Sequence, residues 1–451
     1  MKVVHVPFGY FPGPVGGTEV YVAELARGLS ARGVESVVAA PTDAPLADHY
    51  EHDGVPVYRF TLDDCSSVEE LYGDGDEGAA QAIAAVLEDV AADVLHLHAF
   101  TRAASLRAAR LAKRQGVAVV FTYHTPTASC VRGTLLRDGV EPCDGELNAQ
   151  RCTACLLESR GVPVTLSHAL SRAPVALGNA VASTGVAGPW ATALRARELT
   201  TARHHAFRQL LRESDAIVAV CEWVRSLLAR AGAPPARLML SRQGTPARPA
   251  PNDARDSSGG PLRLAFVGRL HPTKGIDVVL AALAAQSDLR VTLDIYGGAQ
   301  DAEAVRYRDD LVTVSAGDSR VRFRDAIAAE NVVDTLASYD ATIVPSQWLE
   351  TGPLTVLESF AAGVPVIGSN LGGVAELVTH DRDGWLVPHA DRGAWAIALR
   401  RFAADRALLE RLRAGVRRPR STEEVATDMV SVYEAVVPRR GMRRVEPLEV
   451  G

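Results

Sequence analysis

The sequence predicts an α/β protein in which two domains each hold a parallel β-sheet with helices on both faces. Short runs rich in β-branched residues alternate with Ala- and Leu-rich stretches of helical spacing, which is typical of such sheets. With 451 residues, the chain exceeds the usual size of one hydrophobic core, so two domains of ordinary size are expected. Residues 244–261 are rich in Pro, Gly and Ser and lack periodicity, and we therefore place the interdomain linker there.

The first domain is expected to span residues 1–243, with a helix at 19–29 after its first strand. The predicted strands cover residues 2–6, 36–40, 94–97, 118–121, 216–220 and 237–240. No convincing strand occurs from about residue 127 to 200. Because a structureless loop of that length is improbable in a compact domain, this insert is expected to be helical, held by a metal ion, or both.

The second domain is expected to span residues 262–421, with helices between its strands. The predicted strands cover residues 263–267, 291–295, 320–323, 341–344, 365–367 and 385–387. The last segment covers residues 422–451. Within it, residues 422–436 have amphipathic spacing and are expected to return to the first domain, followed by a basic, irregular tail from Pro438.

Composition excludes several classes of protein. Hydrophobic residues make up 47% and charged residues 23% of the chain, as in soluble globular proteins. A net charge of −6 without a long basic run argues against nucleic acid as the main partner. The apolar stretch after Lys2 is too short for a signal peptide, and no segment has the roughly 20 uninterrupted apolar residues of a membrane-spanning helix. We therefore expect a cytoplasmic protein, for which peripheral contact with a membrane surface stays open.

The feature that narrows the function most is a pair of glutamates, Glu350 and Glu358, with seven residues between them. Pro353 suits the first position of a helix, Gly352 can cap that helix, and Gly363 follows where it should stop. This arrangement places Glu350 in a loop and Glu358 on the helix.

The start of this helix is expected to bind an anion. The first free N–H groups, around Leu354 and Thr355, carry the partial positive charge that suits a diphosphate. A carboxylate only accepts hydrogen bonds, so Glu350 and Glu358 are interpreted as ligands of the sugar and ribose hydroxyls of a nucleotide sugar.

Two cations complete the predicted anion site. Arg269 follows a predicted strand and Gly268, and Lys274 precedes a predicted helix, so both lie in one strand-to-helix loop. Such residues are most often surface cations, but in this position they can neutralise a departing diphosphate without a metal ion. In the first domain, Gly16 and Gly17 stand before a predicted helix, where the backbone can approach a donor phosphate closely; a plain flexible turn is the alternative.

Three histidines lie at or near predicted strand ends. His124 directly follows a strand, where the ends of parallel strands face the ligand cleft, and it can hydrogen-bond a sugar hydroxyl. A structural role is the alternative. His96 and His98 alternate along one strand and therefore point to the same face. His98 is the candidate for the cleft, whereas for His96 we expect burial with a backbone partner.

Four of the six cysteines fall within the insert, at Cys130, Cys143, Cys152 and Cys155. Twelve, eight and two residues separate them in turn, and four thiolates with one C-x-x-C pair match a tetrahedral structural zinc site. Such a metal ion would order a segment that is short of apolar core. An iron–sulfur cluster is the alternative, and a cytosolic setting disfavours disulfides.

Several spaced motifs together resemble those of the retaining glycosyltransferases with the GT-B fold, specifically glycosyltransferase family 4. In chain order these are Phe266-Val-Gly-Arg269-Leu-His-Pro-Thr-Lys274-Gly275, Pro345-Ser346, Glu350 to Glu358, Ala361-Ala-Gly-Val-Pro365-Val-Ile-Gly368 and Gly372-Gly373-Val-Ala-Glu376. The resemblance covers nearly the whole chain. It implies two Rossmann-like domains whose parallel sheets face each other across a cleft.

The resemblance also implies an activity: transfer of a sugar from a nucleotide-diphosphate sugar to an acceptor hydroxyl, with retained configuration and no catalytic metal. By this resemblance the catalytic residues are Arg269, Lys274, Glu350 and His124, and the donor-binding residues are Gly16, Gly17, Gly268, Gly352, Leu354, Thr355 and Glu358. The acceptor would be a glycan, a lipid or a natural product.

The chain departs from the family pattern near the expected base pocket. Phe323-Arg324-Asp325 stands where relatives commonly have a Phe-x-Gly turn, and Tyr296-Gly297-Gly298 replaces a short loop. The nucleotide therefore stays unassigned. Two alternatives remain for the function: a nucleotide-sugar-binding protein without transferase activity, and a metal-stapled docking module on a GT-B scaffold.

Overall fold

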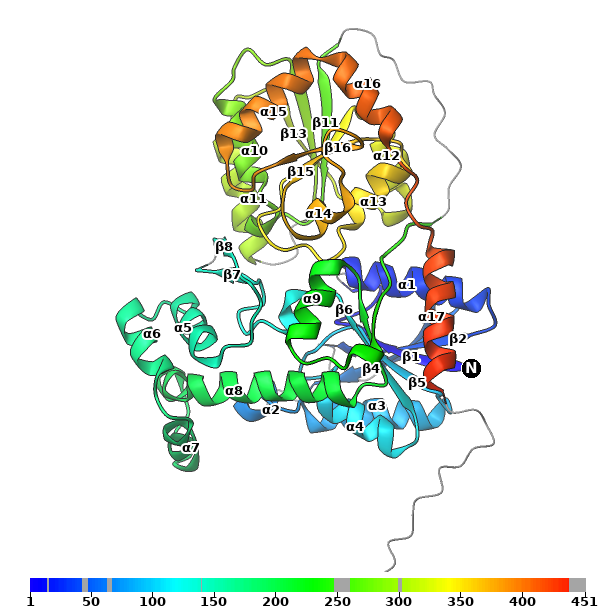
Figure 1. Cartoon of the computed structure of the whole chain (residues 1–451), viewed down its shortest axis with the longest axis vertical. Helices are drawn as coiled ribbons and strands as arrows, with labels where there is room; N and C mark the ends of the chain where they lie inside the picture. The colour runs from blue at the N-terminus through cyan, green and yellow to red at the C-terminus, as the bar shows by residue number, and fades with distance from the viewer. Residues whose placement is uncertain are drawn as a thin grey trace, which may run out of the picture.

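Two α/β domains, stacked along the long axis of the molecule, make up the computed structural model (Figure 1). It describes residues 1–13, 16–42, 48–62, 67–138, 140–246, 260–298 and 302–437. The predicted fold class is confirmed, because each domain holds its own, almost entirely parallel sheet. Most of the predicted linker and the predicted tail, residues 247–259 and 438–451, lie outside the described residues.

The N-terminal sheet has the strand order β10-β9-β6-β5-β1-β2-β4-β3, and only β3 runs antiparallel to its neighbour. Its strands are β1 (Lys2–Val6), β2 (Glu35–Thr42), β3 (His49–His52), β4 (Val55–Thr61), β5 (Val94–Leu97), β6 (Ala118–Tyr123), β9 (Ala216–Ala219) and β10 (Leu238–Leu240). The six predicted strands are confirmed. The hairpin of β3 and β4 was missed, because β3 is short and polar and Pro56 interrupts the apolar pattern of β4. The Asp53-Gly54 turn between them is the sequence signal that identifies it.

Helices cover both faces of this sheet. One face is buried beneath α1 (Gly17–Ser30) and α17 (Thr422–Val436), through a cluster that includes Leu25, Met429 and Tyr433. Helix α17 thus brings the end of the described chain back onto the N-terminal domain. The opposite face lies under α3 (Glu77–Asp89), α4 (Leu106–Arg114), the second half of α8 (Pro189–Glu213) and α9 (Glu222–Arg230).

The C-terminal sheet has the order β13-β12-β11-β14-β15-β16, with every neighbouring pair parallel. Its strands are β11 (Leu262–Val267), β12 (Val291–Tyr296), β13 (Val321–Arg324), β14 (Ala341–Val344), β15 (Val366–Ser369) and β16 (Gly384–Val387). All six match the predicted strands to within two residues. The helices are α10 (Ile276–Ala284), α11 (Ala302–Val314), α15 (Arg392–Ala404) and α16 (Arg406–Gly415) on one face, and α12 (Val332–Leu336), α13 (Leu354–Ala361) and α14 (Gly372–Leu377) on the other.

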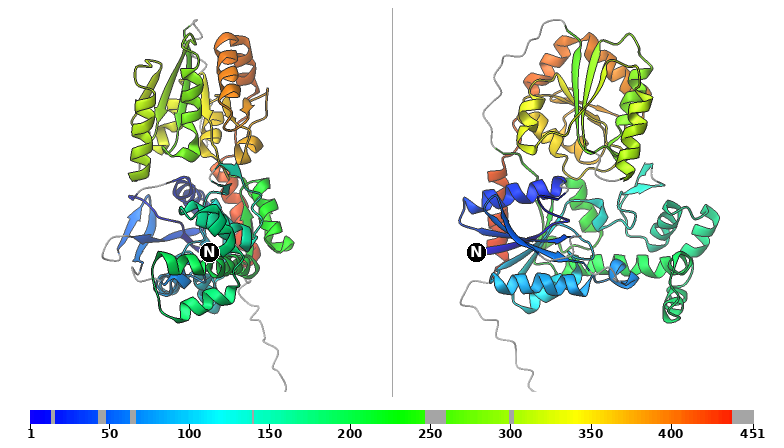
Figure 2. Two further views of the ribbon diagram at one scale, coloured as in Figure 1. Left: turned by 90° about the vertical axis from the view of Figure 1, so that its left-hand side faces the viewer. Right: turned by 180° about the vertical axis from the view of Figure 1, so that it is seen from behind.

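The insert after β6 is mainly helical, as predicted. Helices α5 (Ala149–Ser159), α6 (Val164–Ser171), α7 (Val175–Ser183) and the first half of α8 form an arm that projects sideways from the N-terminal domain (Figure 2, right). A hairpin of two-residue strands, β7 (Leu136–Arg137) and β8 (Glu141–Pro142), precedes them. The short elements elsewhere are α2 (Val68–Tyr72) and the 3₁₀ turns η1 (Pro126–Ala128), η2 (Pro235–Arg237), η3 (Pro272–Lys274) and η4 (Ala329–Asn331).

The chain crosses between the domains twice, and the two crossings are hydrogen-bonded to each other. The Thr245 N–H donates to the Arg420 carbonyl at 3.0 Å, and the Thr422 N–H donates to the Thr245 carbonyl at 2.9 Å. Both connections therefore pass through one small bridge between the domains. In the described part of the chain, no helix combines the length and the apolar character needed to cross a bilayer.

Candidate active site

A cleft of about 560 Å³ opens between the two domains and is lined by residues of both. This volume lies within the range of small-molecule sites. All eleven residues predicted to be catalytic or donor-binding line the cleft: Gly16, Gly17, His124, Gly268, Arg269, Lys274, Glu350, Gly352, Leu354, Thr355 and Glu358. They come together because parallel strands of both sheets end at this level, so that the loops that follow the strands converge.

A buried ion pair lies in the wall that the C-terminal domain contributes. Lys274, at the end of η3, places its Nζ 2.6 Å from Oε1 of Glu350, in the loop after β14. The Ser346 hydroxyl donates to the same oxygen at 2.7 Å. Glu350 is only 7% exposed. Burial alone would raise the pKa of its carboxyl, but the Lys274 charge and the hydrogen bonds hold that pKa below its usual range.

Two residues beside this ion pair were missed by the sequence analysis as site residues. The Lys274 ammonium lies 5.5 Å from the centre of the Trp348 ring, a cation–π distance, and Ser346 is the hydroxyl donor to Glu350. Both occur in residues 345–349, the segment that joins the end of β14 to Glu350. That position was the available signal, since loops after parallel strands build ligand sites.

Helix α13 presents its N-terminus to the cleft, with one correction to the prediction. The helix begins at Leu354 with Pro353 as its N-cap, so Gly352 is not the capping residue. Gly352 instead permits a close interdomain approach, because a Cβ there would lie 2.3 Å from Oε1 of Gln243. Among the described residues no acceptor is found for the N–H groups of Leu354 and Thr355. The helix therefore offers two free donors to an anion.

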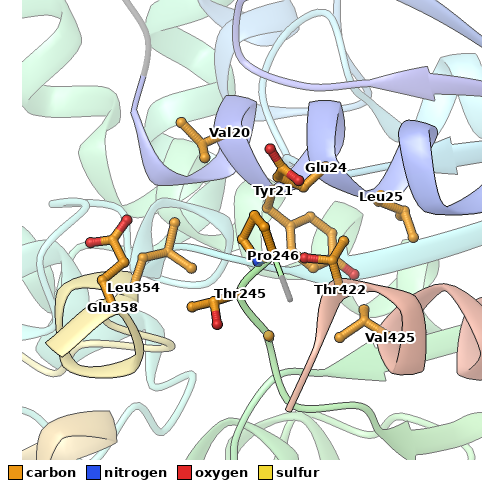
Figure 3. A pocket seen from close by; sticks show the side chains of 11 residues that line it. Val20, Tyr21, Glu24, Leu25, Thr245, Pro246, Leu354, Glu358, Thr422 and Val425 are labelled. Carbon is orange, nitrogen blue, oxygen red and sulfur yellow. The ribbon is translucent and has the colours of Figure 1, made fainter. Parts of the chain in front are cut away.

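Arg269 and Glu358 also line the cleft. Arg269 is exposed in the loop after β11, and no hydrogen bond or ion pair holds its guanidinium within the described part of the chain. Glu358 projects from α13 toward Val20 of α1, close to Leu354 (Figure 3). The cation and the carboxylate thus occupy different parts of the cleft wall, as a ligand with one anionic and one hydroxylated portion requires.

The glycine-rich turn of the first domain ends at the cleft. Gly16 is the N-cap of α1, and its N–H donates to Oε2 of Glu19 at 2.8 Å. That N–H is thus taken by the capping box in this structure. Gly17 faces Leu354 of the other domain, and a Cβ on it would be 3.6 Å from that side chain. The turn contributes a close approach between the two domains at the start of α1.

His124 stands at the cleft end of a row of buried imidazoles. Its Nε2 lies 3.1 Å from Nδ1 of His98, whose Nε2 lies 3.0 Å from Nδ1 of His5, and Nε2 of His5 lies 3.3 Å from the Ser36 hydroxyl. On the cleft side, Nδ1 of His124 faces the Gln243 amide at 3.4 Å. Each ring nitrogen of the row therefore has a protein partner, and the long Gln243 contact is the one that a ligand hydroxyl could replace.

Two expectations for the neighbouring histidines were wrong. His98 does not line the cleft; it is fully buried behind His124. His96 is buried as expected, but its partners are side chains, the Tyr433 hydroxyl of α17 and the Thr122 hydroxyl, both at 2.7 Å. Side-chain partners across 337 residues of sequence are set by tertiary packing, which no local pattern encodes.

These histidines are held neutral by burial. Burial lowers the pKa of His124 and of His5 to about 3 and lowers the pKa values of His96 and His98 well below their usual range. The ring nitrogens of His5, His96 and His98 come within 4.8 Å of one another, as metal ligands would. Because all six nitrogens already have hydrogen-bond partners, the group is better described as a hydrogen-bond network than as a metal site.

The cysteines of the insert give no support to the predicted zinc ion or iron–sulfur cluster. All four are free, partly buried thiols. Burial raises the pKa of Cys152 to about 12, with the neighbouring Cys130 and Cys143 adding to the shift. In the described ranges, the single set of three or more candidate ligands within 4.8 Å is the histidine group. Helix packing of α5 against α6 and α8 orders the insert in this structure.

Polar contacts hold the domains together around the cleft. The Glu376 carboxylate of α14 accepts hydrogen bonds from the N–H groups of Glu222 and Trp223 at 2.8 and 2.7 Å and pairs with Arg242 at 2.9 Å. It thereby caps the N-terminus of α9, where a negative charge is stabilising. The Trp223 indole donates to the Glu350 carbonyl at 2.9 Å, which fixes the loop that carries the buried carboxylate.

Replacing Gly275 by alanine is expected to weaken the fold and displace Lys274. Gly275 has a φ of +69°, and a Cβ there would lie 2.1 Å from the Pro345 carbonyl oxygen. The strained backbone alone costs about 1–2 kcal/mol, and the clash with backbone adds to it. Urea unfolding measures the loss. Gly33→Ala is the matched control, because Gly33 has a φ of +72° with open space around it. Equal losses in the two variants would contradict the packing role of Gly275.

Comparison with known proteins yields matches in both domains. Residues 16–244 match the family described as "Glycosyl transferase 4-like domain", and residues 261–405 match "Glycosyl transferases group 1". A D-inositol 3-phosphate glycosyltransferase of Jonesia denitrificans is 34% identical over 180 residues, 38% of this chain and 42% of that protein. A glycogen synthase of Mycobacterium tuberculosis is 32% identical over 251 residues, 53% of this chain and 58% of that protein. The matches thus span about half the length of these relatives.

Solved structures share the fold over nearly the whole chain. The sucrose-phosphate synthase of Thermosynechococcus elongatus aligns with a TM-score of 0.65 and 21% identity, covering 96% of this chain and 98% of that one. The Anabaena protein HepE, solved in complex with UDP-glucose, aligns with a TM-score of 0.60 and 15% identity over 97% and 98% of the two chains. With one family description covering half of the chain and a second covering most of the other domain, the protein belongs to the glycosyltransferases of the group 1, family 4 type, with the GT-B fold.

Proposed function

We propose that the protein transfers a sugar from a nucleotide-diphosphate sugar to an acceptor hydroxyl with retention of the anomeric configuration. The observation that carries the proposal is the wall of the cleft, where the buried Lys274–Glu350 pair lies beside the free N–H groups of Leu354 and Thr355 and the exposed Arg269. Donors and cations for a diphosphate and acceptors for hydroxyls are thus within one cavity.

The diphosphate is assigned to Arg269, Lys274 and the N-terminus of α13. In this structure Lys274 pairs with Glu350. A bound diphosphate gives the lysine a second anion, and Glu350 then accepts hydrogen bonds from sugar hydroxyls. Preorganised cations and N–H groups stabilise the charge that develops as the bond between the anomeric carbon and the phosphate oxygen breaks.

The chemistry needs no dedicated protein base. The acceptor oxygen forms the new bond to the anomeric carbon on the face that the diphosphate leaves, and the hydroxyl proton passes to a leaving phosphate oxygen. His124 is fully buried, and burial lowers its pKa to about 3, so a neutral imidazole faces the sugar. A neutral ring suits a hydrogen-bonding partner of a sugar hydroxyl better than a proton donor.

No metal ion is required in this proposal, because Arg269 and Lys274 supply the positive charge that a divalent cation would supply elsewhere. In the described part of the chain, no group of three or more carboxylate, histidine and cysteine ligands converges in the cleft. Turnover is accordingly expected to persist in the presence of a chelator.

The nucleotide is left to experiment. Arg322 and Arg324, near the expected base pocket, both pair with the buried Asp294, at 2.8 and 2.9 Å, and Tyr339 donates to the same carboxylate at 2.8 Å. Both guanidinium groups are thus held by one carboxylate of the protein and are not counted among the diphosphate ligands. The relatives named above act on unrelated acceptors, so no acceptor is carried over from them.

One donor from a panel of UDP-, GDP- and dTDP-sugars is expected to raise the melting temperature. Binding to the folded state alone stabilises by about 2.7 kcal/mol at a hundredfold excess over the Kd. With that donor, NMR of the sugar released by hydrolysis or transferred to an acceptor should show the donor's own anomeric configuration as the first product. An inverted first product would refute retention. Donor binding without hydrolysis or transfer to any acceptor would instead identify a binding protein.

A further inference from the structure

The arm formed by α5 to α8 exposes large apolar side chains to an unusual degree. Of the thirteen large hydrophobic residues that are exposed in the described parts of the chain, seven lie within residues 164–194. Trp190, at the start of α8, is 75% exposed, and Val186, just before that helix, is 63% exposed. Exposed apolar residues gathered in one region mark an interaction surface, whereas scattered ones are ordinary.

Helices α6 and α7, the two short helices of the arm, bury small residues and expose aliphatic ones. In α6 the buried residues are the serines Ser167 and Ser171, while Val164 and Leu166 face solvent. In α7 the one buried residue is Gly178, which lies against the Glu198 side chain of α8. A helix in water buries its apolar face. Small residues inside and aliphatic residues outside are the pattern of helices that contact lipid.

The exposed apolar surface extends around each helix rather than along one face. Successive residues of an α-helix are rotated by about 100°, so Val164 and Leu166 point roughly 160° apart, and Val175 and Leu177 of α7 do the same. A second protein molecule covers one face of a helix. A fluid lipid phase contacts every exposed side, so it accounts for this distribution better than a second copy of the chain.

Charge along the arm points to anionic headgroups. No Asp or Glu occurs in residues 159–197, although the whole chain carries a net charge of −6. The flanking carboxylates are partnered, Glu158 with His168 at 3.7 Å and Glu198 with Arg195 at 2.9 Å. Arg172 is exposed at the junction of α6 and α7. Residues 159–197, which carry the exposed aliphatic side chains, therefore offer an exposed cation and no acid of their own.

We propose that the α6–α7 arm docks the protein onto a lipid bilayer with anionic headgroups. With 8 and 9 residues, the two helices are about 12–14 Å long, too short to span a bilayer. Their exposed aliphatic side chains enter the boundary between headgroups and acyl chains, while Trp190 and Arg172 reach the headgroups. The insert that carries this arm begins directly after Pro126, which lines the cleft. This docking does not depend on the proposed sugar transfer.

Vesicle sedimentation tests the proposal with the full-length protein. The protein should bind vesicles of phosphatidylcholine mixed with phosphatidylglycerol and bind pure phosphatidylcholine vesicles more weakly. A fourfold arm variant, Val164→Ser, Leu166→Ser, Val175→Ser and Leu177→Ser, should lose at least about tenfold in affinity, since each side chain loses apolar burial. All four positions are exposed, so the fold should survive.

The matched control carries the same change on the other domain: Val305→Ser, Val312→Ser, Val314→Ser and Ile397→Ser, whose side chains are also exposed. It should bind vesicles as the wild type does. Binding should also shift tryptophan fluorescence to the blue, and Trp190→Phe should abolish that shift.

Three outcomes would overturn the proposal. The first is equal vesicle binding by wild type and arm variant. The second is equal binding to neutral and anionic vesicles, which would show that anionic headgroups are not recognised. The third is no vesicle binding together with a concentration-dependent dimer in size-exclusion chromatography that the arm variant abolishes, which would identify a second copy of the chain as the occupant. Donor binding, measured separately without lipid, reports on the proposed transferase and not on docking.

Discussion

Replacing Lys274 by alanine is expected to lower turnover by at least about 10²–10³-fold. The variant removes the cation placed for the diphosphate, and it also leaves the Glu350 carboxylate buried without its partner, 2.6 Å away in the wild type. Removing one member of a fully buried ion pair costs about 3–5 kcal/mol of folding free energy, and a smaller loss is expected here because the Lys274 side chain is 22% exposed. Steady-state donor turnover and urea unfolding measure the two effects separately.

The same variant should change how stability depends on pH. In the wild type the pKa of Glu350 is held below its usual range, since the Lys274 charge outweighs burial. A carboxylate with a depressed folded-state pKa stabilises the fold fully above its unfolded-state pKa, and that contribution disappears as the pH falls through the folded value. In Lys274→Ala the ammonium no longer opposes burial, so the pKa of Glu350 should rise. The acid-side loss from this carboxyl should then disappear, and where the folded-state pKa exceeds the unfolded-state value the variant should gain stability as the pH falls through it.

Lys113→Ala is the matched control for Lys274→Ala. Lys113 forms an ion pair with Asp215 at 2.8 Å, but both side chains are about one-third exposed, and surface pairs contribute about 0–1 kcal/mol. Turnover should stay at the wild-type level and stability should change little. Wild-type turnover in Lys274→Ala itself would refute the assignment of this lysine to the donor.

A second large effect is expected from acid. Burial lowers the pKa of His5 and His124 to about 3 and the pKa values of His96 and His98 well below normal. The unfolded chain binds these protons at about pH 6.5. The contribution of these neutral histidines to the free energy of unfolding is therefore fully present above pH 6.5. Below that pH it falls by up to about 1.4 kcal/mol per pH unit for each histidine. Four histidines could remove about 8 kcal/mol by pH 5, most of the stability of an ordinary domain.

Urea unfolding at a series of pH values from 8 to 5 measures this loss. The slope of the free energy of unfolding against pH gives the number of protons taken up on unfolding. His5→Gln keeps an amide beside Ser36 and His98 and should reduce the slope by about one proton. His49→Gln, at an exposed position of β3, should leave the slope unchanged. A free energy of unfolding that stays flat from pH 7 to 5 would contradict the neutral network.

The sequence was sufficient for the parts of the site that depend on local order along the chain. Glu350 in its loop, Glu358 on its helix and Lys274 in its strand-to-helix loop each followed from turn residues, helix signals and strand position. Such features are local, and parallel strands then bring their carboxyl ends to one edge. The fold class followed in the same way from the alternation of strands and helices.

Contacts between distant segments could not be predicted. The histidine row depends on strands β1, β5 and β6 lying side by side, and His96 meets a tyrosine 337 residues away. Partner choice there follows from three-dimensional packing. The four cysteines show the opposite case, since four thiols with one C-x-x-C pair suggested a metal site that the geometry of the described residues does not support.

The paired crossings at Thr245 and Ser421 give the molecule a single pivot. Atoms close to the axis of a rotation move least. Any rotation between the domains about this bridge therefore leaves the approach of Gln243 to Gly352 nearly unchanged. The displacement of other cleft contacts grows with their distance from the bridge. Two polar contacts oppose such a rotation. Glu376 accepts hydrogen bonds from the first N–H groups of α9, and the Trp223 indole donates to the Glu350 carbonyl. Water can replace each of these hydrogen bonds when the domains move apart, whereas the apolar contact of Leu349 with the core of the N-terminal domain would be lost.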